Sequence, residues 1–109
     1  MKEYLPIGSV VLINGIERKI AIMGIMQRNG ENPEKEYDYI GVPYPEGYLG
    51  DGTAILFDHS AINDVIFRGY TNPERDALLS LIRMATTDEA TDAIKEEIKK
   101  YLEQQMTLE

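Results

Sequence analysis

The 109-residue chain has 19 acidic and 11 basic side chains and a formal net charge of −8. Its contents of 43% hydrophobic and 28% charged residues are typical of a globular domain and indicate neither a disordered chain nor a membrane protein. Binding to a nucleic-acid backbone or an anionic membrane requires a cationic patch, but the basic pairs Arg18-Lys19 and Lys99-Lys100 lie among acidic residues, so neither partner is expected.

The longest apolar runs, residues 10–13 and 20–26, are far shorter than the ~20 residues of a membrane-spanning helix, so we expect no membrane insertion. Residues 1–6 lack the apolar core and the small-residue cleavage site of a secretory signal peptide. The absence of cysteine excludes disulfides and thiolate chemistry. Together these features favour a cytoplasmic protein.

The first part of the chain is predicted to form a β-hairpin followed by a loop. Residues 10–13 are apolar and precede Asn14-Gly15, a dipeptide that favours the positive φ angles of a type I′ turn. The returning strand, residues 18–26, has apolar side chains on both faces, which indicates a central strand. Residues 27–36 are polar and have no hydrophobic period, so we expect a mobile loop there.

Further short strands complete a predicted antiparallel sheet. Pro43 is expected to end the third strand, and Asp58 is expected to cap a single helical turn over residues 59–63. The three strands are predicted at residues 37–42, 54–57 and 64–70. The five strands together indicate a strongly bent sheet or a small, partly open barrel.

Two helices are predicted after the strands. Asn72 is a good N-cap and Pro73 suits the first helical position, while Thr86 and Glu89 fit a capping box for the second helix. Apolar residues recur at helical spacing in both segments: Leu78, Leu81, Ile82 and Ala85, then Ala90, Ile94, Ile98, Tyr101, Leu102 and Met106. We therefore expect one α+β domain over residues 1–109, β-rich over 1–70 and helical over 71–109, with at least the first helix covering the sheet.

No set of side chains indicates catalysis or metal binding. The single histidine, His59, has no serine in a nucleophile elbow near it, and Ser60 is only its neighbour in sequence. Segment 50–53 lacks the alternating oxygen ligands of a calcium loop, and the glycines of 47–52 do not form a phosphate-binding pattern. We predict no catalytic residue, no metal and no cofactor.

Residues 37–50 contain four of the seven tyrosines. Those on the predicted strand, including Tyr39, would be either part of the sheet wall or part of a binding surface. Tyr44 and Tyr48 flank residues 45–47 in a loop with little core to receive them, a setting typical of interface anchors. The candidate partner-binding residues are Tyr39, Tyr44, Pro45, Glu46, Gly47 and Tyr48. An apolar edge formed by Leu102, Met106 and Leu108 would be a second contact surface if it is not core.

Four segments in order, residues 4–12, 37–41, 44–47 and 62–70, resemble a family of small Gram-positive proteins defined only as domain of unknown function 4176. The resemblance implies an association with type VII secretion loci, beside secreted toxins that carry an N-terminal LXG domain. It therefore implies a cytoplasmic accessory or chaperone-like binder of an export substrate, and not an enzyme.

Three functions are thus compared. The leading one is a non-enzymatic protein-binding adaptor that uses the loop from Tyr44 to Tyr48. The second is a small enzyme or small-ligand domain, which requires Asp38, Glu46 and His59 to converge within hydrogen-bond reach around a concave pocket. The third is a structural homo-oligomer. The sequence leaves the partner and the oligomeric state open.

Overall fold

The computed structural model describes residues 3–30, 32–84 and 88–106. The chain forms two compact units, Met1–Tyr70 and Thr71–Glu109, which divide at the predicted boundary between the β-rich and the helical part. The predicted α+β class is confirmed. The docking of the first helix on the sheet stays a prediction.

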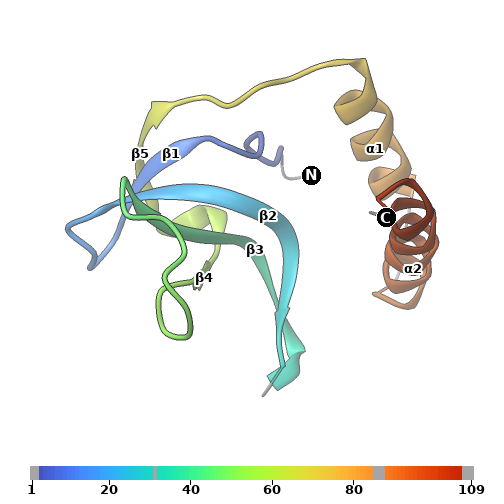
Figure 1. Cartoon of the computed structure of the whole chain (residues 1–109), viewed down its shortest axis with the longest axis horizontal. Coiled ribbons are helices and arrows are strands. Elements are labelled where there is room, and N and C mark those ends of the chain that lie inside the picture. The colour runs from blue at the N-terminus through green and yellow to red at the C-terminus, as the bar shows by residue number, and fades with distance from the viewer. Residues whose placement is uncertain (1–2, 31, 85–87, 107–109) are drawn as a thin grey trace. The chain divides into compact units, whose positions relative to one another are not determined.

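The first unit is built on one antiparallel sheet with the strand order β4-β3-β2-β1-β5 (Figure 1). Its strands are β1 (Val10–Ile13), β2 (Lys19–Asn29), β3 (Asn32–Tyr44), β4 (Ile55–Phe57) and β5 (Ile62–Phe67). In the described residues β4 pairs only with β3 and β5 only with β1, so both are edge strands. The sheet is therefore open, in agreement with the predicted bent sheet or partly open barrel.

The polar stretch 27–36 is a hairpin and not the mobile loop that its composition predicts. β2 continues to Asn29 and β3 begins at Asn32, and these two residues pair across the turn. Arg28 lies opposite Glu36, with 3.7 Å between Arg28 Nη2 and Glu36 Oε2. The hydrophobic period is missing because this part of the hairpin is stabilised by backbone pairing and cross-strand charge instead of by a buried face.

Two predictions about strand ends are also wrong in detail. Asn14 and Gly15 follow β1 as expected, but Met26 is the only described non-glycine residue with a positive φ, so the turn is not type I′. β3 continues beyond Pro43 to Tyr44. β4 pairs only as far along β3 as Gly41, so Pro43 has a strand neighbour on one side, where a missing N–H is tolerated.

The core of this unit lies on one face of the sheet. Its buried hydrophobic residues are Leu5, Val11, Ile13, Ile20, Ile22, Tyr39 and Phe57. Gly41 allows β3 to approach its neighbours closely, because a Cβ atom there would lie 2.5 Å from Ile20 Cγ2 and 2.9 Å from the Ala21 carbonyl oxygen. The glycine is thus required by packing.

The second unit contains α1 (Pro73–Met84) and α2 (Asp88–Gln105). The predicted N-cap is confirmed, because the Arg75 N–H donates to Asn72 Oδ1 at 2.9 Å. Leu79 is the buried residue of α1, whereas Leu81, predicted on the buried face, is exposed. The exposed apolar residues of the C-terminal segment are Tyr101, Leu102 and Met106. Thr86, Ala85 and Leu108, and the side chains of Glu89 and Ala90, lie outside the described residues.

Substitution Gly41→Ala should destabilise the first unit by about 1–3 kcal/mol, because the new methyl group overlaps the backbone of β2 as well as a buried isoleucine. Urea unfolding followed by tyrosine fluorescence measures the change. Gly30→Ala is the matched control, since nothing lies within 4 Å of a Cβ atom at that position. Equal midpoints for both variants would contradict the close approach at Gly41.

Candidate functional site

The loop from Tyr44 to Tyr48 begins where β3 ends. Tyr44 pairs with Lys19 as the last residue of the β2–β3 ladder, and the Tyr44–Pro45 peptide bond is cis. The Gly47 N–H then donates to the Pro43 carbonyl oxygen at 2.7 Å, and Gly47 has a φ of 78°. Glycine adopts this conformation without a Cβ penalty, so the chain can close a tight turn here.

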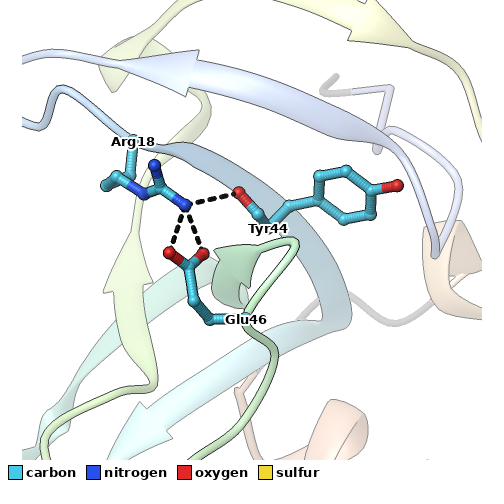
Figure 2. Close-up of polar contacts among 3 residues, drawn as sticks. All are labelled: Arg18, Tyr44 and Glu46. Atoms are coloured by element: carbon cyan, nitrogen blue, oxygen red, sulfur yellow. Dashed lines mark hydrogen bonds and ion pairs between the residues drawn. The ribbon is translucent and has the colours of Figure 1, made fainter.

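An ion pair attaches this loop to the start of β2 (Figure 2). Arg18 Nη2 donates to both carboxylate oxygens of Glu46 and to the Tyr44 carbonyl oxygen, the latter at 3.2 Å. The hydrogen bond from Arg18 is the main cause that holds the pKa of Glu46 below its ordinary value of 4.5. Because both side chains are about half exposed, the pair contributes more to the position of the loop than to global stability.

The aromatic side chains of this loop face solvent. Tyr44 is 52% exposed and Tyr48 is 58% exposed, and Figure 2 shows the Tyr44 ring pointing away from the ion pair. After Tyr48, the Leu49 N–H donates to Thr53 Oγ1, and that hydroxyl donates to the Gly50 carbonyl oxygen. The two rings therefore project from a segment whose backbone is hydrogen-bonded on both sides.

Tyr39, the sixth partner-binding candidate, does not belong to this surface. Its exposed fraction is 0%, and its ring packs against Tyr4 and Phe57 in the core. The alternation along β3 turns its side chain inward, and its hydroxyl accepts the Leu5 N–H at 2.9 Å and lies 2.7 Å from His59 Nδ1. Tyr39 is thus a buried structural residue, and we correct its assignment as a contact residue.

Two aspartates connect β3 to η1 (His59–Ala61), the short helical turn after β4. The turn predicted over residues 59–63 is present but ends at Ala61, where β5 begins, and Asp58 makes no capping hydrogen bond through its side chain. Instead the His59 N–H donates to Asp38 Oδ2 at 2.8 Å, and the Asp38 N–H donates to Asp58 Oδ1 at 3.2 Å. The side chain that caps the turn therefore comes from β3, a contact that no local pattern could indicate.

The set required by the enzyme hypothesis is not formed. Asp38 bonds the backbone N–H of His59 and not its ring, while Glu46 bonds Arg18 at the loop. The His59 ring instead forms a hydrogen bond with the hydroxyl of Tyr39, through Nδ1. Sequence reasoning missed Arg18 and Tyr39 in these roles, because their partners lie 28 and 20 residues away along the chain.

The described ranges, residues 3–30, 32–84 and 88–106, also bear on metal binding and on membrane insertion. No group of three or more histidine, aspartate or glutamate side chains is placed to hold a metal ion there. Within the same ranges, neither helix has the length and apolar character needed to cross a bilayer.

Fold and site together define a small α+β protein with an open, five-stranded antiparallel sheet and an exposed tyrosine loop. Residues 4–78 match the model of a family described as a domain of unknown function, DUF4176, and the chain belongs to this family. The matched region covers the whole sheet and extends into α1. Searches of curated proteins and of solved structures gave no match.

Substitution Tyr39→Phe should lower the free energy of unfolding by about 1–3 kcal/mol, because the buried Leu5 N–H loses its acceptor. Chemical denaturation measures the loss. Tyr37→Phe on the same strand is the control and should change stability by less than about 0.5 kcal/mol, since Tyr37 is only partly buried and its hydroxyl has no described partner. Equal effects of the two substitutions would contradict a structural role of the Tyr39 hydroxyl.

The Glu46 carboxylate should titrate below 4.5 in the native protein, and its pKa should rise in Arg18→Gln. Since the folded-state pKa is lowered, the ion pair is fully present above 4.5 and is lost as the pH falls through the folded pKa. Carboxyl ¹³C chemical shifts recorded against pH test this expectation. Identical Glu46 titration curves for the two proteins would show that Arg18 does not hold the carboxylate.

Proposed function

We propose that this protein is a non-enzymatic protein-binding adaptor and that the Tyr44 to Tyr48 loop is its contact surface. The observation that carries the proposal is the exposure of both tyrosine rings on a hydrogen-bonded loop. Tyrosine buries a large area in an interface and loses little side-chain entropy, and it is therefore enriched among residues that dominate binding energy.

The anchoring of the loop supports the same function. Association has to compensate for the entropy lost when interface segments become ordered. The Arg18–Glu46 ion pair and the bond from the Gly47 N–H to Pro43 restrict the loop before any partner arrives. A partner therefore meets two aromatic anchors with their spacing already limited, which reduces the entropic cost of binding.

For the partner we propose an export substrate of a type VII secretion system, namely a secreted toxin with an N-terminal LXG domain. The protein would hold this substrate in the cytoplasm before export, as a chaperone-like accessory. The proposal rests on the resemblance of the Tyr44 to Gly47 motif and its flanking strands to proteins of such loci.

Alanine substitution of Tyr44 or Tyr48 should weaken binding of the toxin by about 10-fold or more each, because a buried tyrosine anchor contributes roughly 1.4 kcal/mol or more. Co-purification of the two proteins, followed by calorimetric titration, measures the change. Tyr70→Ala is the matched control, since Tyr70 is 78% exposed and lies outside the loop.

Two results would reject this assignment. Full affinity in both loop variants removes the loop as the contact surface. Light scattering that shows self-association of the wild-type protein, abolished in Tyr44→Ala, would assign the loop to a homo-oligomer interface instead.

A further inference from the structure

The first unit has a half-open cleft of about 380 Å³ that includes no residue of the tyrosine loop. Its apolar lining consists of Leu5, Ile62 and Val65, and its polar lining includes His59, Ser60 and Arg68. This volume is in the range of small-ligand sites, in which a few polar groups are combined with an apolar surface.

Two irregularities in β5 build one wall of the cleft. Ile62 pairs with Ile13 and Val65 pairs with Val11, and both of these β1 residues are buried in the core. In a regular strand, residues three apart point to opposite faces. One of the two register shifts between β5 and β1 lies between Ile62 and Val65, which brings both residues to the face of the sheet that holds Ile13 and Val11, and Val65 remains 37% exposed there. Arg68 follows at the same spacing of three and lines the same cleft.

The polar groups of the cleft are mainly hydrogen-bond donors. Arg68 and the Ser60 side chain have no hydrogen bond or ion pair with the described part of the chain. The Tyr39 hydroxyl accepts the Leu5 N–H and lies 2.7 Å from His59 Nδ1, so this ring nitrogen is already engaged by the core. Nε2 is the other ring nitrogen of His59.

We propose that the cleft binds a carboxylate joined to a short aliphatic group. The Arg68 guanidinium matches a carboxylate with two parallel hydrogen bonds, and the Ser60 hydroxyl can donate to the same anion. Leu5, Ile62 and Val65 provide the surface for the aliphatic group. Glu3 also lines the cleft, and its negative charge partly offsets that of Arg68, so a ligand with one carboxylate is favoured over a ligand with two.

This chemistry occurs in free branched-chain acids and in the C-terminal residue of a polypeptide that ends in leucine, isoleucine or valine. Binding here involves residues other than those of the proposed adaptor surface. The inference therefore goes beyond the proposed function, and either can fail without the other.

Nuclear magnetic resonance titration of the ¹⁵N-labelled full chain tests the proposal with three probes. These are 4-methylpentanoate, an acetylated tripeptide that ends in leucine with a free carboxylate, and the same peptide with an amidated C-terminus. Saturable shifts are expected for the amides of the cleft residues with at least one of the carboxylates. The amidated peptide should bind at least about 10-fold more weakly, because it loses the charge-assisted bonds to Arg68.

Arg68→Gln should weaken carboxylate binding by about 10-fold or more, and Arg68→Lys should retain part of it. The matched control is Arg18→Gln, which removes an arginine outside the cleft and should leave carboxylate binding unchanged. Amide spectra of each variant without ligand verify the fold. Tyr44→Ala should also keep carboxylate binding, which separates this test from that of the adaptor surface.

Binding of the small acid alone would identify a free carboxylic acid as the ligand source, and tighter binding of the peptide would identify a polypeptide C-terminus. Both results support the proposal. The absence of saturable shifts at millimolar concentrations of both carboxylates would overturn it, as would equal binding of the amidated peptide or of Arg68→Gln.

Discussion

The hydroxyl group of Tyr39 is the contact on which most of the first unit depends. It is fully buried, and a buried polar group that is not hydrogen-bonded is costly, so the groups that it contacts must be held in place. Among them are the N–H of Leu5, in the segment before β1, and the ring of His59, in the turn before β5. Asp38, the preceding residue of β3, bonds the backbone of the same turn. Asp38 and Tyr39 of β3 thus position the segment before β1 and the turn before β5, although β2 separates β3 from both of these strands. The same contacts place Leu5 and His59 in the cleft.

The tyrosine-rich stretch, residues 37–50, has a buried tyrosine where β4 covers β3 and exposed tyrosines beyond that point. β4 covers β3 only as far as Gly41, and beyond that point β3 keeps a single neighbour, β2. Tyr39, which pairs with Phe57 of β4, is buried, whereas Tyr44 lies beyond the end of that ladder and is exposed. Tyr39 is therefore a core residue and Tyr44 is a surface residue, although they lie on the same strand. The difference follows from the short length of β4, which covers β3 at Tyr39 but not at Tyr44.

The elements that could be predicted from the sequence are those specified by neighbouring residues. The apolar run of β1 and the Asn72 N-cap are of this kind, as is the exposure of Tyr44 beside the prolines at 43 and 45. Long-range contacts decided the rest. The cap of the turn at His59 comes from Asp38, 21 residues away, and the position of Ile62 and Val65 on one face of β5 depends on the shifted register of this strand with β1. The hairpin over residues 27–36 was not predicted, because hydrophobic periodicity reveals a strand only where one of its faces is buried. Here β2 and β3 pair with little apolar surface to bury.

Arg18, beside the tyrosine loop, and Arg68, in the cleft, have different electrostatic effects. Glu46 neutralises Arg18, so the loop presents aromatic surface beside a compensated ion pair, and its selectivity for a partner has to come from shape and apolar contact. Arg68 has no such partner among the described residues. In a chain with a net charge of −8, the long-range field repels anions, so any attraction for a carboxylate is confined to the cleft itself. An anion would therefore be selected there by short-range hydrogen bonds and by the fit of its apolar group, and not by charge alone.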